Sequence, residues 1–159
     1  MLPEIKQDTE NCIAKSSHEK LMDLQNIMLE YRCDMPECEH IFTPGVYSRK
    51  FEMPAGMVVI GRTHRHEHLM IVLSGKAEVV TGGVNRLVLG GDMFVSPAGT
   101  KRAVLALEDT AFLTVHPNPE NIENIEELES EIIEEDDWKP EYHKAVHKNI
   151  GEVKCLLDL

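Results

Sequence analysis

Three histidines lie two residues apart in the middle of the chain, at His64, His66 and His68. If this segment is extended, alternate side chains share a face, so the three imidazole rings point the same way from one strand. Neutral imidazole is the commonest metal ligand in proteins, and three rings on one face are costly to bury unless something binds them. The spacing therefore predicts a site for a divalent transition metal (Zn, Fe, Mn or Ni). The alternative is an exposed polar cluster without a cofactor.

A second segment with a distinctive pattern runs from Gly91 to Arg102, further along the chain. It has the form Gly-x5-Pro-x-Gly-x2-Arg, in which the proline and the last glycine are Pro97 and Gly99. Proline and glycine at this spacing are typical of a strand that enters a tight turn and leaves on the next strand. The pattern is weak alone and more informative beside a histidine-rich strand.

Together the two segments resemble the motifs of the cupin family. The first cupin motif runs through a His-x-His pair and a Glu to a glycine that ends the strand, and Gly75 matches that glycine. The second motif, Gly-x5-Pro-x-Gly-x2-His, is matched by Gly91, Pro97 and Gly99. The resemblance covers roughly residues 45–117, half of the chain. It implies a mainly β fold, a small antiparallel jelly-roll (cupin) barrel whose mouth holds a metal or a ligand.

The chain also resembles small, mostly uncharacterised cupin-like proteins encoded by bacteriophages. The similar stretches are His64–Gly75, Ser96–Ala103 and Thr114–Pro117. This resemblance implies a cytoplasmic protein of a bacterial host, or a virion-associated protein if its role is structural.

The chain departs from the cupin pattern at the positions of the metal ligands. Counting back from Gly75, the two His positions hold Arg62 and His64, and the Glu position holds His68. The His position of the second motif holds Arg102. Only one of the four usual ligands is therefore unchanged, and one is replaced by another residue that can bind a metal.

Under one interpretation, a rearranged set of histidines holds the metal: His64, His68, and either His66 or His116. His116 ends the last predicted strand, and a barrel could bring it close to the strand of the first motif. Three His ligands with an open position suit Lewis-acid or redox chemistry. Arg102 argues against this interpretation, because a permanent guanidinium cation beside a dication is repulsive.

Under a second interpretation, Arg62 and Arg102 form an anion site with the histidines. The planar guanidinium group suits carboxylate and phosphate, so the ligand would be a small acid, a nucleotide or a phosphorylated sugar. Under a third, Arg102 pairs with a carboxylate such as Glu67 or Glu78 and is purely structural. The residue types alone leave these alternatives open.

Turn-forming residues divide the middle of the chain into short segments that predict strands. Nine of the ten glycines lie between Gly45 and Gly99. The β-branched and apolar segments between the turns predict strands at 46–53, 57–61, 68–73, 76–81, 85–89, 92–96, 101–107 and 111–116. Short strands at this spacing indicate a barrel over residues 41–117, and its closure would leave no exposed strand edges.

Residues 1–40 are predicted to be a helical N-terminal extension. Ser16 or Ser17 can cap a helix there. Its apolar stripe consists of Leu21, Leu24, Met28 and Tyr31.

Residues 118–159 are predicted to be an acidic amphipathic helix followed by a C-terminal helical tail. Asn118 is a good N-cap and Pro119 fits the first helical position. A second short helix is expected from Pro140 to Gly151.

The net charge of −12 is concentrated in residues 117–137, which contain ten of the 28 acidic residues and no Lys or Arg. The chain thus has no overall basic footprint, and we expect no binding to nucleic acid. It has neither the apolar stretch of a membrane helix nor a signal-peptide core, so we expect neither membrane insertion nor secretion. The four scattered cysteines are expected to be thiols in a reducing compartment.

Two functions are open from the sequence. The first is a site in the barrel mouth that binds a divalent metal, a small anionic ligand or both. The sequence leaves open whether this site is enzymatic. The second is a non-catalytic structural or interaction protein, whose acidic helix at 118–137 could bind a basic protein partner. The terminal extensions are long for so small a barrel, so we also expect a homo-oligomer, in the first instance a dimer.

Overall fold

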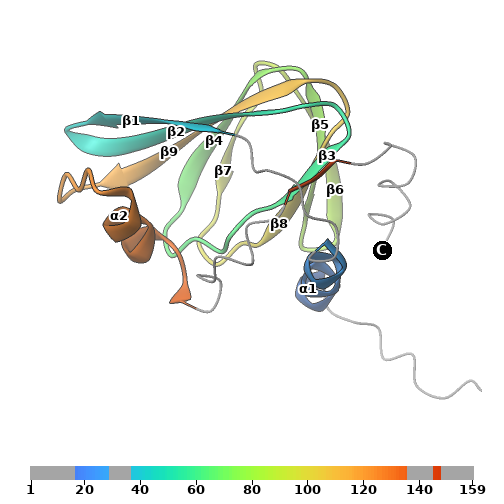
Figure 1. The fold of residues 1–159 in the computed structure, drawn as a ribbon, viewed down its shortest axis with the longest axis horizontal. Helices are drawn as coiled ribbons and strands as arrows, with labels where there is room; N and C mark the ends of the chain where they lie inside the picture. The colour runs from blue at the N-terminus through green and yellow to red at the C-terminus, as the bar shows by residue number, and fades with distance from the viewer. Residues whose placement is uncertain (1–16, 29–36, 136–144, 148–159) are drawn as a thin grey trace, which may run out of the picture.

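The computed structural model describes residues 17–28, 37–135 and 145–147, and within them it has two helices and ten strands (Figure 1). The helices are α1 (Ser17–Met28) and α2 (Ile125–Ile132). The strands are β1 (Cys38–Thr43), β2 (Gly45–Met53), β3 (Met57–Ile60), β4 (His68–Ser74), β5 (Lys76–Thr81), β6 (Val84–Leu89), β7 (Met93–Ser96), β8 (Arg102–Ala106), β9 (Thr110–Asn118) and β10 (Ala145–His147).

The strands form two antiparallel sheets whose order identifies the fold. One sheet has the order β1-β2-β9-β4-β7 and the other β10-β3-β8-β5-β6. Apart from the outer strands β1 and β10, this is the eight-strand, two-sheet arrangement of a jelly roll. The predicted mainly β, antiparallel jelly roll with added helices is therefore confirmed.

The expected closure of the barrel is wrong. Among the described strands, no ladder joins one sheet to the other, so each sheet keeps two edge strands. All eight predicted strands are present as β2–β9, with ends that differ from the predicted ones by at most two residues. The turn residues therefore located the strands well, although they do not determine whether the sheets close.

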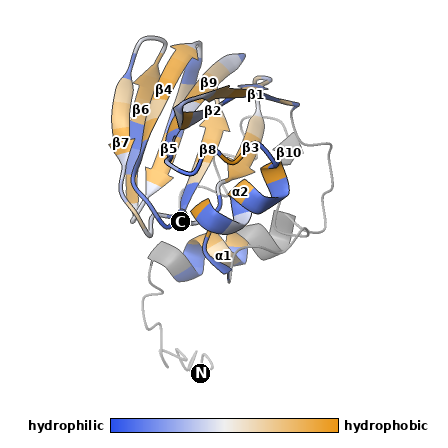
Figure 2. Ribbon diagram, turned by 90° about the vertical axis from the view of Figure 1, so that its left-hand side faces the viewer, coloured by the Kyte–Doolittle hydropathy of each residue, from blue (hydrophilic) through white to orange (hydrophobic). Residues whose placement is uncertain are grey.

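The main core fills the space between the two sheets. Its most buried side chains include Met53, Val72, Val88 and Phe112. Burying one side chain of this size stabilises the fold by roughly 1.5–3 kcal/mol. Figure 2 shows that the strands are predominantly apolar, whereas α1 and α2 have polar and apolar parts.

Helix α1 packs on the outer face of the second sheet. Leu21 and Leu24 form a buried cluster with Ala103 and Leu105 of β8, whose neighbour Val104 points the other way, into the main core. The amphipathic helix predicted near the N-terminus is thus present. Its predicted cap at Ser16, the Met28 side chain and Tyr31 lie outside the described residues.

The helical prediction for residues 1–40 is wrong at its end, where β1 begins at Cys38. β1 and β2 form an antiparallel hairpin, with His40 opposite Arg49 and Phe42 opposite Tyr47. Pairing with a neighbouring strand, which the local pattern does not encode, decides the structure of this segment.

The predicted helix after the barrel begins later than expected. Asn118 is the last residue of β9, where its side-chain amide binds both backbone groups of Ile122. Asn124 caps α2 instead, because its side-chain oxygen accepts a hydrogen bond from Glu127 N at 3.0 Å. Both asparagines have the same capping chemistry, so the register of β9 decided between them.

The helix predicted from Pro140 to Gly151 is not found at Ala145–His147, which pair with β3 as strand β10. The rest of that predicted helix lies outside the described residues. In the part of the chain that is described, no helix is long and apolar enough to cross a membrane.

Gly75, the glycine of the first motif, allows a comparison of two turn positions. Its φ is +83°, and an added Cβ would lie 2.2 Å from the backbone oxygen of Asp109. Gly82 has a φ of +57° but open space around it. We therefore expect Gly75→Ala to lower the free energy of unfolding by about 2–5 kcal/mol, and Gly82→Ala by only about 1–2 kcal/mol. Urea unfolding measures both, and equal losses would contradict the clash at Gly75.

Candidate functional site

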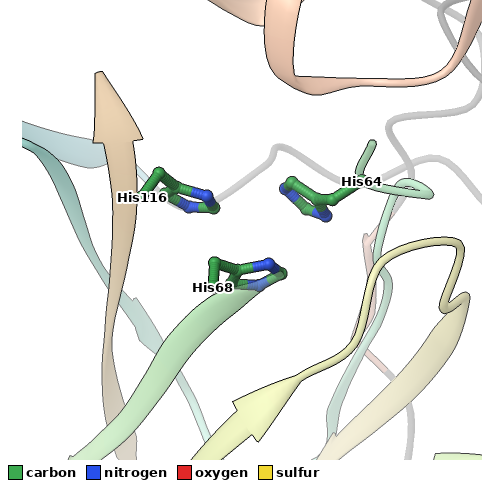
Figure 3. Close-up of side chains that lie close together, drawn as sticks. All are labelled: His64, His68 and His116. Carbon is green, nitrogen blue, oxygen red and sulfur yellow. The ribbon is translucent and has the colours of Figure 1, made fainter. Parts of the chain in front are cut away.

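Three histidines from different parts of the chain meet at one end of the jelly roll (Figure 3). His116 lies near the end of β9, and His68 is the first residue of β4. His64 lies on the segment between β3 and β4. We call these three residues the histidine triad.

The three histidines of the triad lie close enough together that they could share a metal ion. One ring nitrogen from each histidine lies within 4.8 Å of those of the other two. The side chains are buried, with exposed fractions of 8% for His64, 6% for His68 and 3% for His116. These three residues are the ones among the described residues that could together hold a metal ion.

The predicted histidine strand is not present, because His64, His66 and His68 do not share one strand. The chain bends at residues 65 and 66, and His66 is exposed, outside the triad. His64 is instead held by an isolated antiparallel bridge to Ile133 and by a hydrogen bond from Gly99 N to its carbonyl oxygen at 2.8 Å. The turn of the second motif therefore positions a histidine of the first.

Residues 132–134, at and just after the end of α2, form hydrogen bonds with residues 63–65. Arg65 N donates to the oxygen of Ile132 at 2.8 Å, and Arg65 Nε to that of Ile133 at 2.7 Å. Glu134 N donates to the oxygen of Thr63 at 3.0 Å. The position of His64 thus depends on residues about 70 positions further along the chain, at 132–134.

The hydrogen bonds of the triad leave two ring nitrogens without a partner. His64 and His68 each bind a backbone group, of Arg62 and His66 respectively. Their other ring nitrogens, Nε2 of His64 and Nδ1 of His68, are buried and have no hydrogen-bond partner among the described residues. A buried ring nitrogen without a hydrogen-bond partner keeps its electron pair available for a metal ion, and Figure 3 shows the three rings pointing toward one another.

Burial keeps the triad uncharged at neutral pH. Desolvation, followed by the charges of neighbouring groups, lowers the pKa of His64 to about 3 and that of His116 to about 2. Desolvation and then the charge of Arg102 lower the pKa of His68 to about 4. Neutral imidazole is the form that binds metal.

The two predicted anion-binding arginines lie in different surroundings. Arg102 is buried, donates to Ser96 Oγ and to Met70 Sδ, and makes no ion pair with Glu67, Glu78 or any other carboxylate of the described residues. Burial lowers its pKa to about 10, so it stays a cation at neutral pH. The purely structural pairing of Arg102 with a carboxylate is therefore not observed.

Arg62 lies beside Glu129 of α2, and so does Arg49. The sequence had pointed to Arg62 but to neither Arg49 nor Glu129. Arg62 Nη1 lies 3.1 Å from Glu129 Oε2, and Arg49 Nη1 lies 3.9 Å from Glu129 Oε1. One carboxylate thus spans two guanidinium groups. Arg49 lies on the same face of β2 as the core residues Tyr47 and Phe51, so a charged residue at that position was a local signal that the sequence analysis did not use. Glu129 lies within an acidic run and had no such signal.

A cavity of about 330 Å³ adjoins the triad through His64. Arg49, Arg62 and Glu129 also line it, as do apolar residues of β3 and α2. His40 contributes from β1, where its Nδ1 is 2.8 Å from the hydroxyl of Tyr47. A larger groove of about 800 Å³ lies elsewhere, beside Pro54 and Asp109, and no histidine lines it.

No protein-family model and no curated protein matches the chain. Among solved structures, KdgF from Halomonas sp. is 27% identical, covers 49% of this chain and 74% of that chain, and has a TM-score of 0.45. A Cupin 2 conserved barrel domain protein from Salinispora arenicola is 18% identical, and the match covers 58% of this chain and 84% of that chain with a TM-score of 0.48. The DMSP lyase DddQ from Ruegeria pomeroyi is 20% identical, and the match covers 54% of this chain and 48% of that chain with a TM-score of 0.46. Because all three TM-scores are below 0.5, the fold assignment depends on the strand order.

The low pKa values of the triad predict that stability falls in acid. Below about pH 6.5 the unfolded chain protonates these histidines, whereas the folded chain resists protonation down to about pH 4 at His68. Stability is therefore present above this window and is lost as the pH falls through it, by up to about 1.4 kcal/mol per pH unit for each histidine. Urea unfolding of chelator-treated protein at about pH 7 and about pH 5 measures this loss.

A matched pair of variants isolates the contribution of the triad. His116→Asn should reduce the loss of stability between the two pH values, because it removes one buried titrating ring. His66→Asn should leave that loss unchanged, because His66 is exposed. The same loss in both variants would contradict the assignment to the buried rings.

Proposed function

We propose that this chain is a cupin-type protein that binds a divalent transition metal through His64, His68 and His116, beside a cavity for a small anionic ligand. One observation carries the proposal. Each histidine of the triad offers one ring nitrogen within 4.8 Å of those of the other two, and two buried ring nitrogens of the triad have no hydrogen-bond partner among the described residues. Leaving a buried polar atom unpaired costs about 1–3 kcal/mol, which a bound cation would offset.

The residues of the triad fit such a metal. Imidazole suits Zn, Fe and Ni, and three His ligands leave further positions open for a ligand. A metal held there would supply Lewis-acid or redox chemistry. In this proposal the third ligand is His116 rather than His66, which is supported by the position of the His116 ring beside those of His64 and His68 and by the exposure of His66.

Metal content of purified variants tests the proposal. Wild-type protein, purified without chelator or affinity tag, should retain close to one transition-metal ion per chain, measured by elemental analysis. His68→Asn should lower the metal affinity by more than roughly 10- to 100-fold, which is the loss typical when a residue that only hydrogen-bonds to a metal ligand is replaced. His66→Asn is the control and should bind like wild type.

Two results would overturn this proposal. One is wild-type protein that takes up no Zn, Fe, Mn or Ni even when each is added to folded protein. The other is equal metal affinity in His68→Asn and His66→Asn.

A second function, assembly with another copy of the chain, is favoured by an apolar surface. The outer face of β9, β4 and β7 presents a continuous set of apolar side chains and no charged ones: Leu69, Ile71, Leu73, Met93, Val95, Leu113 and Val115. The most exposed of them are Met93 at 64% and Val95 at 57%. Because this face is uncharged, it can meet the same face of a second copy without opposing like charges, despite the net charge of −12.

Substitution of Val95 tests the assembly. A lysine at the centre of an apolar interface is costly to desolvate, so we expect Val95→Lys to convert a wild-type dimer into a monomer. Glu52→Lys, on the polar part of the same sheet, should remain dimeric. Sedimentation at micromolar concentration distinguishes these states, and a monomeric wild type would exclude assembly through this face.

A further inference from the structure

We infer that Arg49 and Arg62 form a carboxylate-binding site beside the histidine triad, and that Glu129 of α2 occupies it as an internal competitor. This inference rests on the proposed function in that it names the chemical class of the anionic ligand. It assigns a small carboxylic acid to the cavity. It also replaces Arg102 by Arg49 as the second arginine of the anion site.

The contacts of Glu129 show that a carboxylate fits between the two arginines. Its oxygens are divided between them, with Oε2 lying 3.1 Å from Arg62 Nη1 and Oε1 lying 3.9 Å from Arg49 Nη1. Side-chain exposure is only 12% for Arg62, 22% for Arg49 and 20% for Glu129. Ion pairs that are shielded in this way are screened less by salt than pairs on an open surface.

The coordination of Arg49 is incomplete. Its Nε atom is buried and has no hydrogen-bond partner among the described residues, and its contact with Glu129 exceeds hydrogen-bonding distance. A guanidinium group has five N–H donors in a planar arrangement that matches a carboxylate. A carboxylate placed closer to Arg49 than Glu129 would therefore gain hydrogen bonds that Glu129 does not make with Arg49.

The charges at this end of the fold favour an anion. Among the described residues that line the cavity, Arg49 and Arg62 are cations and Glu129 is the one carboxylate. His64 lines the same cavity, so a ligand held by the arginines would also lie beside the triad. A volume of about 330 Å³ lies at the lower end of the range for small-molecule sites, which suits a small acid better than a nucleotide.

The position of Glu129 on α2 explains why it can act as a competitor. α2 is anchored by Leu128 and Ile132, which are buried against Tyr47. The other acidic residues at the start of the helix, Glu126 and Glu127, are exposed, whereas Glu129 is turned toward the arginines. Release of Glu129 by an incoming carboxylate would not require α2 to leave its apolar contacts.

Calorimetric titration with malate, a small hydroxy acid, tests the inference on the full chain with and without added metal. Glu129→Gln keeps the size of the side chain but removes its charge, so it should bind malate about tenfold more tightly than wild type. Glu126→Gln removes an exposed charge from the same helix and should bind like wild type. Adding Arg49→Gln or Arg62→Gln to the Glu129→Gln variant should abolish the gain.

The outcomes separate this inference from the metal site. Equal malate affinity in Glu129→Gln and Glu126→Gln would overturn the inference even if metal is bound. If metal-free protein binds malate and loses that binding when Arg49 or Arg62 is replaced by Gln, the inference is supported even if the metal proposal fails. Tighter binding of inorganic phosphate than of malate by Glu129→Gln would overturn the choice of a carboxylate.

A second variant covers the case in which Glu129→Gln does not fold. Glu129→Asp shortens the side chain by one methylene group, which withdraws the carboxylate from both guanidinium groups and keeps the charge of the helix. Its malate affinity should lie between those of wild type and Glu129→Gln. Malate should also raise the melting temperature of this variant more than that of Glu126→Gln, and the reverse order would contradict the inference.

Discussion

The pairing of residues 63–65 with residues 132–134 is the contact on which the proposed site depends. It joins the segment before β4 to the end of α2 through backbone hydrogen bonds, and the bridge between His64 and Ile133 lies at its centre. The same contact places His64 against the other triad members and fixes α2 over the cavity. Because α2 is fixed, Glu129 reaches Arg49 and Arg62. The same backbone hydrogen bonds therefore hold both the triad and the lining of the cavity in place, although the residues involved are far apart in the chain.

The electrostatics of this end of the molecule follow from burying basic groups together. The guanidinium groups of Arg49 and Arg102 both disfavour protonation of His64 and His68. Arg49 also disfavours protonation of His116. Desolvation acts in the same direction and is the larger effect at all three histidines. The rings are consequently held in the neutral form, which has a free electron pair for a metal. The arginines thus contribute to the state of the triad without being ligands.

The sequence predicts the jelly roll better than it predicts the site. Strands β2–β9 were located because glycine and proline mark most of their turns, and those signals are local. β1 and β10 depend on pairing with a distant strand, and the start of α2 depends on how far β9 extends, so local patterns placed them wrongly. His64 and His68 were identified, but the reason given, alternation along one strand, was incorrect. Glu129 carries no local signal, because its role arises only where α2 contacts the sheet. Arg49 did carry one, since it takes an inward position in the alternation of β2, between Tyr47 and Phe51.

The replacement of a carboxylate by an imidazole connects the triad to the arginines. The cupin motif that the sequence resembles has a Glu where this chain has His68. A dication held by neutral imidazoles alone would keep its full charge in a buried site, next to permanently charged arginines. Such a charge distribution is unfavourable unless an anion joins it. Glu129 supplies one negative charge, but it lies against the arginines rather than among the histidine nitrogens. A small carboxylic acid that contacts both groups would balance the charge of the proposed site, so the imidazole at position 68 and the proposed carboxylate site at Arg49 and Arg62 fit together electrostatically.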